Sequence, residues 1–161
     1  RFEPFDVRTL GIRRTPSVGG PTDEVLGTDH LHEALAQTEY LVLCCPLTEA
    51  TRGLIGSAEL STLSPEAVIV NVARGAVIDT DSLVSSLRRG RIGGAALDVT
   101  DPEPLPDDHP LWNFDEVLIT PHSAGSTPKY YDRLADIVSD NVRRLADGEP
   151  LRNRVRAAES D

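Results

Sequence analysis

Cationic side chains are scarce in this sequence of 161 residues, and lysine is almost missing. Sixteen residues are Lys or Arg against 26 Asp or Glu, which gives a formal net charge of −10. This balance disfavours electrostatic binding to nucleic acid or to an anionic membrane, so neither partner is expected. Lys129 is the one lysine. An acid excess with so little lysine indicates a halophilic protein, and an ordinary acidic protein from a GC-rich genome is the alternative.

Long apolar runs and a secretion signal are also missing. No run approaches the roughly 20 apolar residues that span a bilayer, and no secretory pattern opens the sequence. A cytoplasmic location is therefore expected. The first residue is Arg1 rather than Met, and the sequence starts inside a folded pattern. We therefore expect a fragment, a processed chain or a partial one.

Cysteine is limited to two adjacent residues, Cys44 and Cys45, within an apolar run. Adjacent cysteines rarely form a disulfide, because the bond requires more widely separated Cα atoms. A zinc site needs further ligands at suitable spacing, and these are lacking. The pattern predicts two buried free thiols in a reducing compartment and no metal site.

Strand-like and helix-like segments alternate along the chain. The expected strands are 6–12, 40–45, 67–72, 94–99 and 116–120, and the expected helices are 29–37, 57–63, 80–89 and about 128–147. Segment 13–28, rich in Gly, Pro and Thr, is expected to be a loop. The continuous apolar run 40–45 predicts a strand covered on both faces. This alternation predicts a doubly wound parallel α/β sheet of the Rossmann type, with helices on both faces.

The expected domain organisation is simple. Residues 1–150 form one dinucleotide-binding domain, which is incomplete at its N-terminal side, and residues 151–161 form a polar, mobile tail. Sheets of this type bind ligands at the carboxyl ends of their strands. The residues that directly follow each strand are therefore the candidates for function.

Two arginines, Arg13 and Arg14, follow the first expected strand. In dinucleotide folds an acidic residue at this place accepts hydrogen bonds from the adenine ribose. Arginine cannot accept such bonds, but its guanidinium can donate two parallel bonds to a 2′-phosphate. The pair favours NADP(H) over NAD(H), and the alternative is two solvated loop arginines.

Further polar residues follow the later strands. Arg74 comes after 67–72 and could bind a substrate carboxylate, although such arginines often form only ion pairs. Asp98, at the end of 94–99, could accept a hydrogen bond from a ligand amide. Glu103 lies between two prolines, which would hold it on a stiff loop, and a plain surface turn is the alternative.

His122 follows the last expected strand in the segment PHSAG. A lone histidine in such a loop is usually structural. Paired with Glu103, however, its imidazole would be oriented and stabilised in the protonated form, as a proton donor requires. The remaining histidines, His30, His32 and His109, lie in ordinary helix or turn contexts.

These motifs resemble one known family. The segments VNVARGAVIDTDSLVSSLRRGRIGGAALDVTDPEPLPDDHPLW and NFDEVLITPHSAGSTP are similar to the signature region of the D-isomer-specific 2-hydroxyacid dehydrogenases, and CPLTEATRGLIG resembles their cofactor-side loop. The family's catalytic arginine, glutamate and histidine are matched by Arg74, Glu103 and His122, with separations of 29 and 19 residues. The likeness extends from Asp6 to about Leu145.

The resemblance implies a reaction and a cofactor site. A hydride would pass between NADP(H) or NAD(H) and a 2-keto or D-2-hydroxy acid, with Arg74 holding the carboxylate, His122 protonating the oxygen and Glu103 orienting His122. A homodimer is implied as well. The cofactor-binding residues that we expect are Arg13, Arg14, Thr15, Cys45, Pro46, Thr51, Val72, Ala73, Arg74, Asp98, His122, Ala124 and Gly125.

The sequence also departs from the family pattern. The G-x-G-x-x-G loop that cradles the pyrophosphate is missing, and so is the second, flavodoxin-like domain. The chain alone is therefore expected to be inactive. Phosphite and phosphoglycerate oxidation remain open as reactions. A nucleotide-sensing protein, like the corepressors that resemble this family, is the alternative to an enzyme, and a degenerate domain that only dimerises is a third interpretation.

Overall fold

The computed structural model describes residues 3–154, and its internal contacts divide the chain into two units, Arg1–Ala124 and Gly125–Asp161. The sequence-based boundary at residue 150 assigns the last long helix to the nucleotide-binding domain, whereas these contacts assign that helix to the second unit.

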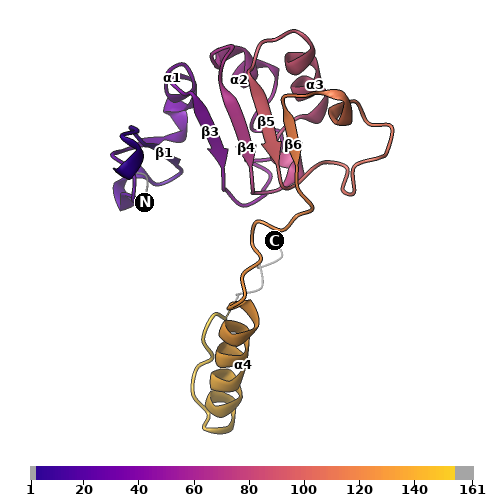
Figure 1. Ribbon diagram of the computed structural model, residues 1–161. Coiled ribbons are helices and arrows are strands. Elements are labelled where there is room, and N and C mark those ends of the chain that lie inside the picture. The colour runs from indigo at the N-terminus through magenta and orange to yellow at the C-terminus, as the bar shows by residue number, and fades with distance from the viewer. Residues whose placement is uncertain (1–2, 155–161) are drawn as a thin grey trace. The chain divides into compact units, whose positions relative to one another are not determined.

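The first unit is a parallel α/β structure (Figure 1). Strands β3, β4, β5 and β6 form one four-stranded parallel sheet in that order, and β1 pairs in parallel with β2 in a separate sheet. The parallel α/β class predicted from the alternating pattern is confirmed. The strands are β1 (Leu10–Arg13), β2 (Glu24–Gly27), β3 (Tyr40–Leu43), β4 (Val68–Asn71), β5 (Gly94–Leu97) and β6 (Val117–Ile119), and the helices are α1 (Leu31–Leu35), α2 (Ser57–Thr62) and α3 (Thr80–Arg88).

Helix α3 shows how local sequence defines an element. The carboxylate of Asp79 accepts a hydrogen bond from the backbone N–H of Ser82 at 2.7 Å, which caps the start of the helix. Arg88 lies in its last turn, where a cation interacts favourably with the helix dipole. Gly90, at φ +59°, ends the helix in the left-handed conformation that glycine adopts without strain.

The core lies between the four-stranded sheet and its helices. Side chains on one face of the sheet pack in a single buried cluster with leucines of α2 and α3, among them Leu43, Ile69, Ala95, Leu97, Leu60 and Leu83. Because alternate residues of a strand point to opposite faces, the neighbouring positions project to the other side of the sheet. Within the described part of the first unit, no helix packs on that other face as α2 and α3 pack on the core face, and Val42 and Leu118 are exposed there.

Strand β3 corrects one prediction. Tyr40 and Val42 are 69% and 52% exposed, so the prediction that segment 40–45 is covered on both faces is wrong. Val42 aligns through Val70 and Ala96 with Leu118 of β6, which is 63% exposed, so the open face extends across all four strands. The apolar run reflects burial of only one of its two faces.

The cysteines correct another prediction in part. Both thiols are free, as expected, but Cys44 is exposed and Cys45 is only half-buried. The prediction of two buried thiols is therefore wrong for Cys44. It follows the end of β3, two residues after the exposed Val42.

The expected loop 13–28 contains a strand that the sequence pattern did not indicate. Strand β2 is only four residues long and aligns with β1 from Leu10↔Glu24 to Arg13↔Gly27. The start of this pairing is held by Asp23, whose carboxylate accepts from the backbone N–H and the hydroxyl of Thr9, both at 2.7 Å. These bonds lower the pKa of Asp23. Strand β1 accordingly begins at Leu10 rather than at Asp6.

The second unit consists of helix α4 (Tyr130–Ala146) and the segment that follows it. The side chain of Asn141 exchanges two hydrogen bonds with the backbone of Arg152, and Asp140 pairs with Arg144 and Arg152 at 3.1 and 3.0 Å. The beginning of the expected mobile tail is thus bonded to α4, while residues 155–161 lie outside the described residues. Among the described helices, none is both long and apolar enough to cross a membrane.

Candidate active site

The carboxyl ends of the four parallel strands meet at one edge of the sheet, and the predicted catalytic residues follow these ends. Arg74 comes shortly after β4, Glu103 lies in the loop that follows β5, and His122 comes shortly after β6. Neighbouring strands therefore deliver a guanidinium, a carboxylate and an imidazole to the same edge, as the sequence predicted.

His122 and Glu103 form a direct pair. The imidazole Nδ1 lies 2.6 Å from the Glu103 Oε1, which is a short hydrogen bond between an imidazole and a carboxylate. His122 adopts φ +51°, in the left-handed region that a non-glycine residue enters rarely. Its side chain is 48% exposed. With Nδ1 bound to the carboxylate, Nε2 is the ring nitrogen left to meet a ligand.

Arg74 lies in a tight turn that is fixed by its own backbone. Its guanidinium donates to the carbonyl of Ala73 at 2.6 Å, and its carbonyl accepts from the backbone N–H of Val77 at 3.1 Å. Ala73 is buried, whereas Arg74 is exposed. The turn thus presents the guanidinium at the surface from a rigid base.

Gly75 allows the Arg74 turn to approach the loop that carries Glu103. A Cβ atom at Gly75 would lie 2.0 Å from the carbonyl carbon and oxygen of Thr100, so a larger residue does not fit. The Thr80 hydroxyl also donates to the carbonyl of Asp101 at 2.9 Å. These contacts hold the two catalytic loops against each other.

Asp98 lies directly after β5 and is only 7% exposed. Its Oδ1 accepts from the Thr120 hydroxyl at 2.6 Å and from the backbone N–H of Ser123 at 2.9 Å, and its Oδ2 accepts from the N–H of Ala124 at 2.8 Å. The Thr120 hydroxyl, followed by these N–H groups and the nearby His122, lowers the pKa of Asp98. The sequence suggested that Asp98 accepts from a ligand amide; the structure gives it three partners within the protein.

Asn71, the last residue of β4, was not predicted as a site residue. It is 1% exposed. Its Oδ1 accepts from the N–H of Ala73 and its Nδ2 donates to the carbonyl of Arg74, both at 3.0 Å. The available signal was an asparagine at the end of the apolar run AVIVNV, because a buried amide must find hydrogen-bond partners.

The expected cofactor-side loop follows β3. The Thr51 hydroxyl donates to the carbonyl of Pro46 at 2.7 Å and accepts from the backbone N–H of Thr48 at 2.8 Å, which folds the loop back on itself. Burial raises the pKa of the Cys45 thiol, so the thiol stays protonated near neutral pH. Val72 lies nearby, after β4, and its N–H donates to the carbonyl of Leu43.

The remaining predicted cofactor residues lie elsewhere. Arg13 ends β1 in the separate two-stranded sheet, and its guanidinium donates to the carbonyl of Gly19. Arg14 is exposed, and Thr15 precedes a short 3₁₀ turn. Ala124 is bonded to Asp98 as described, whereas Gly125 begins the second unit.

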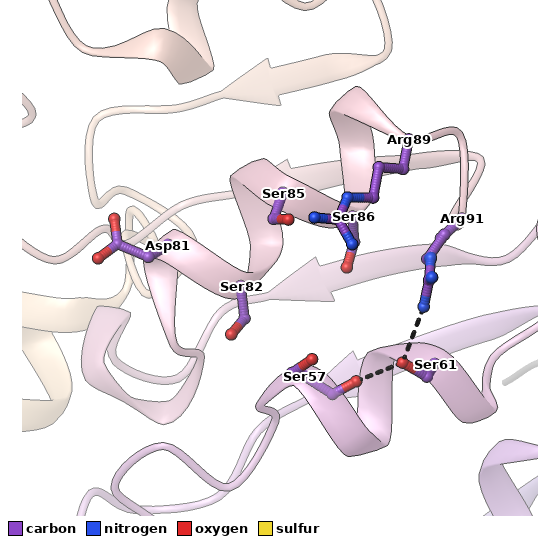
Figure 2. Close-up of a pocket in the computed structure, with 8 residues that line it drawn as sticks. All are labelled: Ser57, Ser61, Asp81, Ser82, Ser85, Ser86, Arg89 and Arg91. Carbon is purple, nitrogen blue, oxygen red and sulfur yellow. Dashed lines mark hydrogen bonds between the residues drawn. The ribbon is translucent and has the colours of Figure 1, made fainter.

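A separate hollow lies between α2 and α3 (Figure 2). Five serines, two arginines and one aspartate line it, and Arg91 donates to Ser61 at 3.4 Å. None of the predicted catalytic residues is among them, so this hollow is not the catalytic site. In the described part of the chain, no group of three or more His, Cys, Asp or Glu side chains is arranged to hold a metal ion.

Comparison with known proteins agrees with a nucleotide-binding α/β domain. The model of the D-isomer specific 2-hydroxyacid dehydrogenase NAD binding domain matches residues 1–124. The chain therefore belongs to this dehydrogenase family.

Individual relatives support the assignment. A glyoxylate reductase of Aeropyrum pernix is 39% identical over 135 residues, which is 83% of this chain and 40% of the relative. A D-isomer specific 2-hydroxyacid dehydrogenase of Xanthobacter autotrophicus, solved with NADPH and MES, is 39% identical with a TM-score of 0.80, covering 91% of this chain and 60% of that one.

An NADPH-dependent glyoxylate/hydroxypyruvate reductase of Sinorhizobium meliloti, solved with NADP and sulfate, is 29% identical with a TM-score of 0.82. That match covers 95% of this chain and 49% of the solved one. The chain thus spans about half the length of the relatives that it matches.

Proposed function

We propose that this chain is the cofactor-binding and catalytic part of a D-2-hydroxyacid dehydrogenase, which interconverts a 2-keto acid and a D-2-hydroxy acid with a nicotinamide cofactor. The observation that supports this most directly is the 2.6 Å contact between His122 and Glu103, at the same sheet edge as Arg74. A cation, an oriented imidazole and a carboxylate are the groups that such a reaction requires.

Each side chain has a distinct part in the proposed reaction. Arg74 binds the substrate carboxylate through its planar guanidinium. Glu103 holds the His122 ring by Nδ1, so that Nε2 donates a proton to the carbonyl oxygen at C2. The bound nicotinamide cofactor supplies the hydride that C2 receives. Hydride at carbon and proton at oxygen together convert the keto acid into the hydroxy acid.

The residues present fit the nicotinamide side of such a cofactor better than its pyrophosphate. The loop between Pro46 and Thr51 and the turn of Val72 and Ala73 follow adjacent parallel strands, as cofactor-contacting loops do in this fold. The glycine-rich pyrophosphate loop is not part of this sequence. These loops would therefore hold the reactive end of the cofactor.

NADP(H) is the proposed cofactor, with NAD(H) as the alternative. Arg13 and Arg14 stand where an acidic residue would bind the ribose of NAD(H), and a guanidinium suits a 2′-phosphate. The NADPH and NADP in the two similar solved structures agree with this choice.

Short 2-keto acids are the proposed substrates, because the relatives include reductases named for glyoxylate and hydroxypyruvate. We further propose a homodimer that works in the cytoplasm. The 161 residues alone are expected to lack turnover, since the chain spans about half the length of these relatives.

The first test is the initial rate of NADPH and NADH oxidation with a panel of 2-keto acids in high potassium chloride, using the protein as its gene encodes it. Faster oxidation of NADPH supports both the dehydrogenase and the role of Arg13 and Arg14. A preference for NADH would still support a dehydrogenase, but it would contradict the proposed binding of a 2′-phosphate by arginine. Cofactor binding without turnover on any keto acid favours the nucleotide-sensing alternative.

The same assay on the 161-residue chain tests the proposal that these residues alone lack turnover. No turnover is expected from it, even where the gene product is active. Substantial turnover by the 161-residue chain would show that these residues suffice and would overturn that proposal. Size-exclusion chromatography with light scattering on the gene product tests the proposed dimer.

A further inference from the structure

Two buried polar side chains lie beneath the catalytic edge. Among the described residues the buried polar or charged side chains are Asn71, Ser86 and Asp98, and the first and last of these lie at the carboxyl ends of the adjacent strands β4 and β5. A buried polar group is unfavourable unless it is hydrogen-bonded, so the partners of these two side chains indicate their role.

Within the described residues, the side chain of Asn71 is hydrogen-bonded only to the turn that carries Arg74. Its amide oxygen accepts from the N–H of Ala73, and its amide nitrogen donates to the carbonyl of Arg74, each at 3.0 Å. One side chain thus fixes the backbone on both sides of the peptide between these residues. Displacement of either the Ala73 N–H or the Arg74 carbonyl would leave a buried amide group without its partner.

Among the same residues, the side chain of Asp98 is hydrogen-bonded only to the turn that carries His122. Its three donors are the hydroxyl of Thr120, which precedes His122, and the backbone N–H groups of Ser123 and Ala124, which follow it. The carboxylate therefore holds the ends of a short segment whose central residue has φ +51°. Such a conformation persists where surrounding bonds determine it.

The two side chains support different turns, but they lie at the ends of two paired strands. The N–H of Asp98 donates to the carbonyl of Asn71 at 3.0 Å, as part of the β4–β5 pairing. Each buried side chain then reaches forward to a different catalytic loop. The site is thereby divided into a substrate-binding turn and a proton-donating turn, each with its own buried support.

We propose that Asn71 and Asp98 are separate positioning residues, with Asn71 placing Arg74 for the substrate carboxylate and Asp98 placing His122 for proton donation. This inference rests on the proposed dehydrogenase function. It differs from a general structural role, because the two residues should affect different kinetic constants.

The test compares Asn71→Asp and Asp98→Asn, which keep side-chain size, in steady-state assays of the gene product with a keto acid that it turns over. Asn71→Asp loses the bond to the Arg74 carbonyl, so KM should rise about tenfold or more with kcat within about threefold. Asp98→Asn should lower kcat about tenfold or more, with KM and NADPH affinity within about threefold. Ser86→Ala, the third buried polar position, is the control and should change neither constant.

Second variants cover the case in which a substitution prevents folding. Asn71→Ser keeps a smaller polar group, and Thr120→Val removes only the hydroxyl that binds Asp98, so each should show a weaker form of the same pattern. Equal effects of both pairs on kcat and KM would overturn the proposal. Weaker NADPH binding by Asp98→Asn with kcat unchanged would overturn it too, and would instead support Asp98 as an acceptor for the cofactor amide.

A measurement without turnover separates this inference from the proposed function. In ¹H–¹⁵N spectra of the 161-residue chain at neutral pH, Asp98→Asn should move the Ser123 and Ala124 amide signals, because it changes the group that accepts their hydrogen bonds, whereas Ser86→Ala should leave them in place. If the signals move but no keto acid is reduced, the proposed function fails while the contact stands. Signals that are insensitive to the Asp98 carboxylate would overturn the inference for His122.

Discussion

His122 is the residue on which the proposed chemistry depends most directly. Replacing it by alanine removes the proton donor, so we expect kcat to fall by about 10²–10⁴-fold, the usual contribution of a general acid. NADPH affinity should be nearly unchanged. Stopped-flow or steady-state rates with a cofactor titration check both expectations. His30→Ala is the control, since His30 is exposed and pairs only with Asp29 and Glu33. A His122→Ala enzyme with nearly normal kcat would refute the assignment.

Substitution of Gly75 should have a steric effect on the catalytic loops. Gly75→Ala places a methyl group 2.0 Å from the Thr100 carbonyl, so the Arg74 turn and the loop of Glu103 must separate. We expect a loss of roughly 1–3 kcal/mol or more in unfolding free energy, together with a rise in KM. Urea denaturation and steady-state kinetics measure the two effects. Gly20→Ala, whose Cβ would be 3.4 Å from the nearest atom, should be nearly neutral. Equal stability of the two variants would contradict the close approach.

Arg74, Glu103 and His122 were predicted from their places after the strands together with the family resemblance, and the structure brings the last two into contact. Asn71 could not be ranked in the same way, because a buried amide acts through partners that the sequence does not name. Asp98 was recognised as polar at a strand end, but whether its oxygens face a ligand or the protein depends on the path of residues 120–124.

At the scale of elements, the cap of α3 offers a direct test. The hydrogen bond from the Ser82 backbone to Asp79 stabilises the first turn, so Asp79→Ala should lower the unfolding free energy by about 0.5–2 kcal/mol. Asp81→Ala, two residues further on in the first turn and without a capping bond, is the matched control. Chemical denaturation of both variants decides whether the cap has the expected value.

Helices and strands were predictable to different degrees. The helices centred on 57–63, 80–89 and 128–147 were found close to their predicted positions, because their apolar spacing and end signals are local. Strand β2 was missed because four residues among Gly and Pro carry no periodicity, and its pairing depends on Thr9 and Asp23 across the loop. The prediction that both faces of β3 are buried was wrong, because an apolar run does not specify how many of its faces are covered.

At the scale of the whole molecule, acid should unfold the protein through its carboxylates. Hydrogen bonds and ion pairs lower the pKa values of Asp23, Asp79, Asp98 and Asp140. The stabilising contribution is complete above the ordinary aspartate pKa of about 3.9, and it is lost as the pH falls toward the lower folded values. The urea concentration at the unfolding midpoint, measured from pH 6 to pH 2, should decrease once the pH is below about 4. In Asp98→Asn this dependence should be shallower, and an unchanged slope would contradict the pKa shift of Asp98.

Salt should have the opposite effect. With a net charge of −10, like charges repel one another across the folded surface, and dissolved ions screen that repulsion. We expect the melting temperature to rise between low and molar potassium chloride, as the halophilic interpretation requires. Differential scanning fluorimetry across a salt series measures this. A protein that is equally stable and monodisperse without added salt would favour the ordinary acidic alternative.

The open face of the four-stranded sheet has a consequence for handling the protein. Tyr40, Val42 and Leu118 expose apolar surface, and β3 and β6 are the outer strands of their sheet among the described residues. Such surfaces favour association between molecules, which mutual repulsion of the negative charges opposes. Near the isoelectric point of about 4.8 that repulsion vanishes. The protein should therefore precipitate as the pH passes through this value, before its carboxylates are protonated enough to unfold it, so an acid titration needs a dilute sample and a rapid pH jump.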